Sequence, residues 1–348
     1  MTTTLVIFIV VALAFDFLNG FNDSANIVAT MISSRAMSPQ RALLIAAIFH
    51  FVGPFVLGVA VATTIGHKVV DATVLTTTLV LAALLAAILW NLITWYRGIP
   101  SSSSHALVGG LVGSACTAKL VSQLQAHAIH GFRDVLDVFG VVHPQGMLTI
   151  VVALIVSPML GLLSGFVLIR LTYFLGRLAS PKINEFFRRS QIVTCIGLAL
   201  SHGGNDAQKT MGLIAMALLA AGVTHEFTVP LWVVVACAGM IALGTAVGGR
   251  RQIKTIGAKF YKIRPVHAFA TQLASAALII TASLLGGPVS TTHVVSSAVM
   301  GAGGGERLSM VRWGVGRQIV MAWVLTMPLS ALVAAVTYLG LWAAGVAN

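Results

Sequence analysis

The sequence predicts an all-α polytopic membrane protein with two inverted-topology repeats, broken helices and two re-entrant hairpins. Three observations support this fold class: a very apolar composition, two motifs that each occur twice, and basic residues confined to short segments. Of the 348 residues, 57% are hydrophobic and 9% are charged, and the mean hydropathy is +0.95. Ordinary soluble domains do not have this composition.

Apolar stretches that could cross a bilayer recur along the whole chain. A spanning helix needs roughly 20 mostly apolar residues. The stretches cover residues 4–18, 42–64, 74–95, 147–169, 190–222, 228–247, 266–285 and 318–345. We therefore expect eight or more crossings and no separate soluble domain. The first stretch lacks a basic region and a small-residue cleavage site, so we expect a retained span rather than a signal peptide.

The positive charge of the chain has a topological pattern. The net charge is +12, yet Lys and Arg gather in short segments, chiefly residues 170–189 and 250–264. Nucleic-acid binding is therefore not expected, and the positive-inside rule places both segments in the cytoplasm. Residues 119–146 are poor in positive charge and are expected outside. The predicted location is the lipid bilayer of the plasma membrane or inner membrane, as a multi-pass protein.

Two motifs each occur twice. The stretch "GFNDSAN" at 20–26 returns as "GGNDAQK" at 203–209, and "GIPSSSSHALVGGLVG" at 98–113 returns as "GGPVSTTHVVSSAVMG" at 286–301. The copies are 183 and 188 residues apart, so a single duplication explains both pairs. Basic residues place the end of the first signature span inside, whereas the second signature span begins inside. The two copies are therefore predicted to be antiparallel, which is typical of secondary transporters.

The repeats divide the chain into three parts. Residues 1–146 form the first repeat, with a hairpin at 98–118 and an external interfacial segment. Residues 147–189 form a connecting span and a cytoplasmic basic loop, and residues 190–348 form the second repeat, with a hairpin at 286–304. Each hairpin motif has a Pro, then residues that favour helix N-caps, then a short apolar helix. The polar signatures in mid-span predict a helix break in each repeat.

Three acidic residues fall inside predicted spans: Asp16, Asp23 and Asp206. An ionisable side chain at the bilayer centre costs ~3 kcal/mol, so it usually faces the protein interior and marks an ion or substrate path. Asp23 and Asp206 are equivalent in the repeat, which favours a functional role for both. The counterpart of Asp16 is Ala199, so a structural contact and a proton-handling or orienting role both remain open for Asp16.

The hairpin motifs predict an anion site. Helix N-termini inside the membrane offer free N–H groups and a positive dipole end. Hydroxyl side chains add donors there, although they could also serve only as caps of their own helices: Ser101, Ser102, Ser103, Ser104, Ser290, Thr291 and Thr292. His105 and His293 follow these caps as candidate proton carriers or as neutral orienting groups.

An anion beside two carboxylates is electrostatically unfavourable unless cations or protons neutralise the carboxylates. Anion entry would then depend on cation entry, which is symport. Asn22, Asn26 and Thr30 offer hard oxygen donors suited to sodium. A carboxylate also accepts a hydrogen bond from hydrogen phosphate but not from sulfate, which favours phosphate as the substrate.

The signatures "GFNDSANIVAT" and "SHGGNDAQKTMG", with "PSSSSHALVG" and "PVSTTHVV", resemble those of the inorganic phosphate transporter (PiT) family. The resemblance implies phosphate uptake driven by a sodium or proton gradient, an inverted-repeat fold with two re-entrant hairpins, and a homodimer. By position, it implies a binding centre that includes Asn22, Asp23, Asn26, Asn205 and Asp206, closed by the hydroxyls of 102–104 and 290–292. Thr30 joins Asp23 and Asp206 as a candidate for cation coupling.

One position departs from many family members, which repeat an Asn where this chain has Lys209. The Gln-Lys version resembles the bacterial branch, which includes proton-coupled carriers of neutral metal-phosphate. Lys209 follows Asp206 by three residues, on the same helical face. It could pair with an Asp, contact phosphate, replace a coupling cation, or form a salt bridge without touching a ligand.

Other classes fit less well. An anion channel would need a selectivity ring that the sequence lacks, and a symporter of another oxyanion stays open. An intramembrane hydrolase would need a Ser–His pair, but Ser104 and His105 are neighbours and point to different faces of a helix. Cys116, Cys195 and Cys237 have no CxxC spacing, so no zinc site or other cofactor is expected beyond a coupling Na+ or H+.

Overall fold

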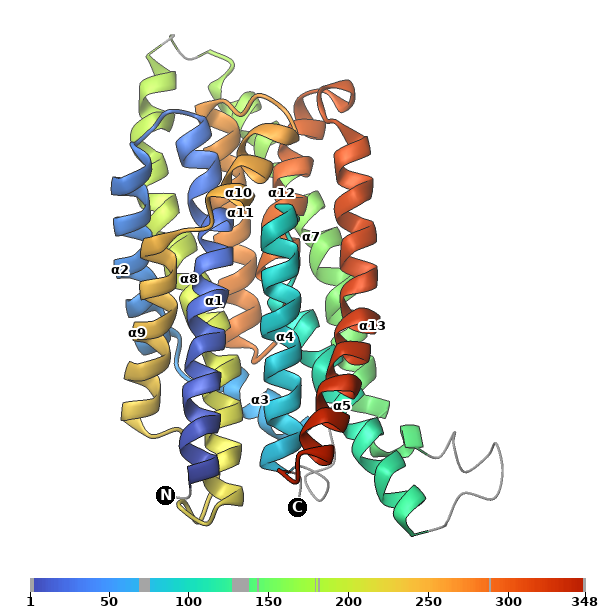
Figure 1. Cartoon of the computed structure of the whole chain (residues 1–348). Coiled ribbons are helices and arrows are strands. Elements are labelled where there is room, and N and C mark those ends of the chain that lie inside the picture. Colours follow the sequence, from blue (N-terminus) through green and yellow to red (C-terminus); the bar gives the residue numbers. More distant parts are fainter. Residues whose placement is uncertain are drawn as a thin grey trace.

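The computed structural model describes residues 3–68, 76–126, 138–142, 144–178, 180, 182–287 and 289–346. Long helices lie side by side across this part of the chain (Figure 1), and it contains no β-strand. The α-helices are α1 (Thr3–Ser33), α2 (Pro39–Leu57), α3 (Ala60–Lys68), α4 (Thr77–Arg97), α5 (Ser103–Gln125), α7 (Pro144–Gly176), α8 (Ile183–Ala220), α9 (Leu231–Val247), α10 (Arg250–Lys254), α11 (Pro265–Leu284), α12 (Thr291–Glu306) and α13 (Trp313–Ala343).

The predicted fold class, an all-α polytopic membrane protein, is confirmed. Among the described residues, seven helices are long and apolar enough to span a membrane. The number rises to eight when α9 and the segment Arg250–Lys259, bent by 60°, count as one span. The described part of each predicted apolar stretch is mainly helical, and the stretch 42–64 is divided between α2 and α3. The first stretch, 4–18, is only half of α1, because the helix continues through the polar signature.

The breaks expected at the two signatures are absent. Helix α1 has 31 residues and α8 has 38, and both run without interruption through the motif. Several polar side chains of the signatures bond to residues on the same helical turn or on neighbouring helices, and the helix backbone stays continuous. The glycines of the motifs allow close helix packing rather than a break.

Helices from the two halves of the chain pack tightly against each other. A Cβ on Gly53 of α2 would lie 2.3 Å from the carbonyl oxygen of Leu200 on α8. A Cβ on Gly244 of α9 would lie 1.9 Å from the carbonyl oxygen of Phe17 on α1. Phe17 and Leu200 are 183 residues apart, the spacing of the signatures. Each signature helix is therefore held by the helix that follows the other signature.

The helices of the hairpin motifs also pack against helices that are distant in the sequence. A Cβ on Gly113 of α5 would lie 2.2 Å from the carbonyl oxygen of Ala331 on α13, and one on Gly301 of α12 would lie 2.1 Å from that of Leu162 on α7. Gly113 and Gly301 are 188 residues apart. Helix α1 begins at the end of the molecule where α8 finishes (Figure 1). The inverted duplication remains a prediction that these matched contacts support.

The two hairpin helices begin next to each other inside the protein. The rings of His105 on α5 and His293 on α12 are 4.2 Å apart between centroids. Helix α12 has 16 residues, whereas α5 has 23 and meets the length and hydropathy expected of a span. The re-entrant path therefore stays a prediction. The middle of the external interfacial segment, residues 127–137, lies outside the described residues.

Candidate functional site

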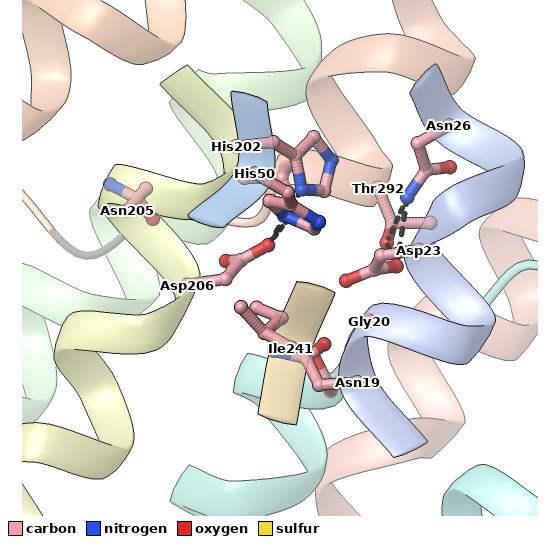
Figure 2. A network of polar contacts seen from close by, with 12 residues as sticks. Asn19, Gly20, Asp23, Asn26, His50, His202, Asn205, Asp206, Ile241 and Thr292 are labelled. Carbon is pink, nitrogen blue, oxygen red and sulfur yellow. Dashed lines mark hydrogen bonds and ion pairs between the residues drawn. The ribbon is translucent and has the colours of Figure 1, made fainter. Parts of the chain in front are cut away.

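The two signatures and the starts of the two hairpin helices meet at the centre of the helix bundle. Asp23 lies on α1 and Asp206 on α8, and their carboxylates face each other (Figure 2). Thr292, from the first turn of α12, points into the same space. Both carboxylates are buried, with exposed fractions of 3% and 0%.

Asp23 is held by one helix of each half. Its Oδ1 accepts hydrogen bonds from Asn26 Nδ2 at 2.8 Å and from Thr292 Oγ1 at 2.9 Å. The Asn26 amide also donates to Thr292 Oγ1 at 3.0 Å, which closes a triangle (Figure 2). The second carboxylate oxygen, Oδ2, is buried and has no hydrogen-bond partner among the described residues. It is therefore an acceptor available to a cation or a protonated ligand.

Asp206 has a cationic partner, whereas Asp23 has no lysine or arginine partner in the described ranges of the chain. Its Oδ1 lies 2.5 Å from Lys209 Nζ, and its Oδ2 lies 2.8 Å from His202 Nδ1 and 3.0 Å from Thr291 Oγ1. The Lys209 ammonium also donates to Ser104 Oγ at 2.5 Å and to the carbonyl oxygen of Val289 at 3.2 Å. With 1% exposure, Lys209 joins α8 to the starts of both hairpin helices.

The carboxylate pair forms a potential cation site. One ligand atom each from Asp23, His202 and Asp206 lies within 4.8 Å of the other two. Two full negative charges at that separation would repel by about 3 kcal/mol at an effective dielectric constant of about 20. Lys209 compensates one of these charges, and the other has no lysine or arginine partner among the described residues.

The helix N-termini at this centre are capped by their own hydroxyls. Ser102 Oγ accepts from the backbone N–H of His105 at 3.2 Å, and Ser290 Oγ accepts from that of His293 at 3.3 Å. These two hydroxyls therefore act as N-caps, the alternative considered for the hairpin motifs. Ser103 donates instead to Asn19 Oδ1 at 2.7 Å. Both helix dipoles begin at the centre, which favours an anion there.

The contacts between signatures and hairpins are related by the repeat. Ser104 and Thr292 are equivalent, as are Asn26 and Lys209. Thr292 bonds to Asn26, and Ser104 bonds to Lys209. Each signature is thus tied to the start of the hairpin helix from the other half. The difference between the halves is one of charge, because the amide of one half is replaced by an ammonium group in the other.

Four of the sequence-predicted residues have other nearest partners. The amide of Asn22 donates to the carbonyl oxygen of Asn91 at 3.4 Å, and that of Asn205 donates to Ser283 Oγ at 2.8 Å. Asn205 points away from the carboxylate pair (Figure 2). Thr30 Oγ1 accepts from Gln272 at 3.1 Å, and Asp16 Oδ1 accepts from Thr210 Oγ1 at 2.5 Å. They surround the centre without contacting either carboxylate of the pair through a hydrogen bond.

The two histidines of the hairpin motifs lie beside the centre. His293 packs edge-on against His105 and stacks on Trp323, with ring centroids 3.9 Å apart. Trp323 Nε1 in turn donates to the carbonyl oxygen of Pro100, next to the first hairpin helix. This aromatic contact joins both hairpins, and it is compatible with an orienting role for the histidines.

The sequence analysis missed two polar residues that border the centre. His202 contacts Asp206, and Asn19 accepts from Ser103. They are equivalent in the repeat, one residue before the glycines at which the motif comparison began. Extending the comparison by one position would have found both. His50 is also missed; its ring lies 5.6 Å from that of His202, and its Nδ1 contacts Thr245 Oγ1 at 2.6 Å.

Comparison with known proteins assigns the chain to a family. The phosphate transporter family profile matches residues 19–334. Probable low-affinity inorganic phosphate transporters of Bacillus subtilis (strain 168) and Rhizobium meliloti (strain 1021) are each 43% identical to it, over 96% and 95% of this chain and 96% and 94% of their own lengths. A solved structure titled "The sodium-dependent phosphate transporter" is similar with a TM-score of 0.82 and 26% identity over 100% of both chains. The chain therefore belongs to the phosphate transporter family, and it is a transporter rather than an enzyme.

Proposed function

We propose that this protein is a cation-coupled symporter that carries inorganic phosphate across the plasma membrane by alternating access. The observation that carries the proposal is the buried pair Asp23 and Asp206, which has one lysine for two carboxylates and lies where two helix N-termini meet. The helix ends attract an anion, and the uncompensated carboxylate repels it. Binding of a cation at the carboxylate pair removes this repulsion.

The coupling cation is either a sodium ion or a proton. Asp23 Oδ2 has no hydrogen bond from the described residues, and His202 and Asp206 offer further ligand atoms nearby. The similar solved structure is titled as sodium-dependent, which supports sodium. Lys209 supports the proton instead. Its ammonium group already occupies a cation position beside Asp206, so the carboxylate pair needs fewer external cations.

Alternating access is supported by the way the hairpin helices are tied. Helix α12 is bonded to Asp23 on α1 and to Asp206 on α8, and α5 is bonded to Lys209 on α8. These bonds run between side chains of different elements, so they can be exchanged for bonds to phosphate without unfolding a helix. Opening of one hairpin toward each side would expose the centre alternately, as in other transporters built from repeats.

The test is uptake of radiolabelled phosphate into proteoliposomes, with sodium and proton gradients imposed separately and with or without magnesium. One of the two gradients is expected to drive accumulation above equilibrium. Dependence on magnesium would identify a metal-phosphate complex as the transported species. Preference for another oxyanion would overturn the substrate, and flux that needs neither gradient and far exceeds carrier turnover would indicate an anion channel.

The family resemblance adds a homodimer to this proposal. Chemical crosslinking in native membranes, followed by mass determination of the purified complex, distinguishes one copy from two. A monomer that transports phosphate at the full rate would remove the homodimer from the mechanism.

A further inference from the structure

A pocket lies away from the carboxylate centre, beside the basic segment 250–264. Its volume is about 610 Å³, within the range of sites that hold organic ligands. Its wall combines the end of α1, the segment that leads from α10 to α11, and the residue that precedes α13. These elements meet at the end of the bundle that the positive-inside rule places in the cytoplasm.

The wall of this pocket carries four cationic side chains and no acidic one: Arg35, Lys262, Arg264 and Arg312. Arg264 is paired with Glu306 and also donates to Tyr173. The side chains of Arg35, Lys262 and Arg312 form no ion pair or hydrogen bond within the part of the chain that the structure describes. The pocket therefore has three positive charges without a counter-charge among the described residues.

Helix dipoles add to this positive potential. Arg264 is the N-cap residue of α11 and Arg312 is the N-cap residue of α13, so two helix N-termini border the pocket. The partial positive charge of a helix N-terminus favours an anion. The fixed dipoles and the three unpaired side chains act in the same direction.

The pocket wall is tightly built. The turn Thr255–Lys259 is a π-helix, a form that occurs often at functional sites. A Cβ on Gly257 would lie 2.2 Å from Ser33 Oγ, so this turn packs directly against the end of α1. Arg35 has φ of 57°, the only positive φ outside glycine among the described residues. Such a conformation is strained by roughly 1–3 kcal/mol and here turns the chain at the pocket.

We propose that this pocket binds a phosphorylated organic anion with at least two negative charges. Three unpaired cations match a polyvalent phosphate better than a single carboxylate. A guanidinium group can also donate two parallel hydrogen bonds to two oxygens of one phosphate. The same chemistry is offered by a soluble nucleotide and by an anionic lipid headgroup, which basic pockets at the cytoplasmic side of membrane helices also bind. The bound anion would contact the end of α1, the helix that carries Asp23.

The experiment measures binding to the full-length protein in phosphatidylcholine nanodiscs. ATP with EDTA is the soluble probe, and nanodiscs that contain cardiolipin supply the lipid probe, with retained cardiolipin counted by native mass spectrometry. The test variant is the triple substitution Arg35→Gln, Lys262→Gln and Arg312→Gln. A matched control removes three exposed cations outside the pocket by Arg41→Gln, Arg250→Gln and Lys254→Gln.

The triple variant is expected to lose on the order of a hundredfold in affinity for one of the two probes, whereas the control changes by less than about threefold. Loss confined to ATP identifies a soluble phosphate, and loss confined to cardiolipin identifies a lipid headgroup. Single substitutions at the three positions provide the same comparison if the triple variant does not fold. Equal binding by the wild type, the test variant and the control would overturn the proposal, and so would an equal loss in the test variant and the control. The positive charges would then serve only to set the membrane topology.

Discussion

Replacement of Lys209 by methionine tests the electrostatics of the centre most directly. The substitution keeps an unbranched side chain that is one heavy atom shorter, and it removes the ammonium group that contacts Asp206 Oδ1 and Ser104 Oγ, both at 2.5 Å. Of its partners among the described residues, Asp206 then keeps His202 and Thr291. The result is a buried carboxylate without its cation, next to a second carboxylate.

The magnitude follows from the cost of breaking a buried ion pair. Removal of one partner from such a pair destabilises a protein by about 3–5 kcal/mol. At roughly 2 °C per kcal/mol for a large domain, the midpoint of thermal unfolding should fall by about 6–10 °C. Combining Lys209→Met with Asp206→Asn removes the uncompensated charge, so more than half of this loss should return, whereas phosphate uptake should not.

The assay combines thermal unfolding in detergent, followed by size-exclusion chromatography, with phosphate uptake in proteoliposomes. Lys254→Met, on the exposed face of α10, is the control for loss of a positive charge. A third variant, Lys209→Asn, gives position 209 the same residue type as Asn26, its equivalent in the first signature. It should insert normally and change the dependence of uptake on sodium, protons and magnesium.

Two results would refute this reasoning. Lys209→Met could unfold at the same temperature as the wild type, in which case Lys209 does not compensate Asp206. Alternatively, Lys209→Asn could keep both the rate of uptake and its ion dependence, in which case the ammonium group has no part in coupling.

Three further predictions concern the centre and its packing. Asp23→Asn and Asp206→Asn should each lower uptake at least roughly tenfold in folded, inserted protein, since charged hydrogen bonds contribute about 1.5–3 kcal/mol; normal uptake by both would contradict the carboxylate site. Gly244→Ala places a Cβ 1.9 Å from a carbonyl oxygen of α1 and should cost about 1–3 kcal/mol in thermal unfolding, whereas Gly239→Ala on the same helix meets nothing within 4 Å and should be neutral. His202→Leu removes a contact to Asp206, so uptake should fall roughly tenfold or more while expression is kept; unchanged uptake would exclude the histidine from the site.

The repeated motifs explain why the sequence points to particular residues for the candidate site. Asp23 and Asp206 are recognisable because two carboxylates in apolar spans recur at one spacing, and a membrane leaves few structural uses for them. The hydroxyls at 102–104 and 290–292 follow from the second motif by the same comparison. The structure brings Ser104, Thr291 and Thr292 into contact with the signatures, as the pattern indicates.

Other features of the site could not be predicted from the sequence pattern. Unbroken helices at the signatures could not be foreseen, because a polar cluster with glycines is compatible both with a break and with close packing. The choice depends on helices α2 and α9, each distant in sequence from the signature helix that it packs against. Their glycines Gly53 and Gly244 have no room for a side chain against α8 and α1. Likewise, the sequence could not show that the hydroxyl of Thr30 accepts a hydrogen bond from Gln272 on α11, and the part of Thr30 in cation coupling stays a prediction.

The sequence by itself determined the membrane-spanning helical architecture, the two repeated motifs, and the residue types that these motifs place inside apolar spans. These properties depend on composition and spacing, which the linear chain already contains. Only the tertiary structure decided that Lys209 neutralises Asp206 rather than Asp23, and that Asp16 and Asn205 turn to other partners. The physical reason is that charge compensation and hydrogen bonding act over a few ångströms, and folding sets those distances between residues as far apart as Asp23 and Thr292.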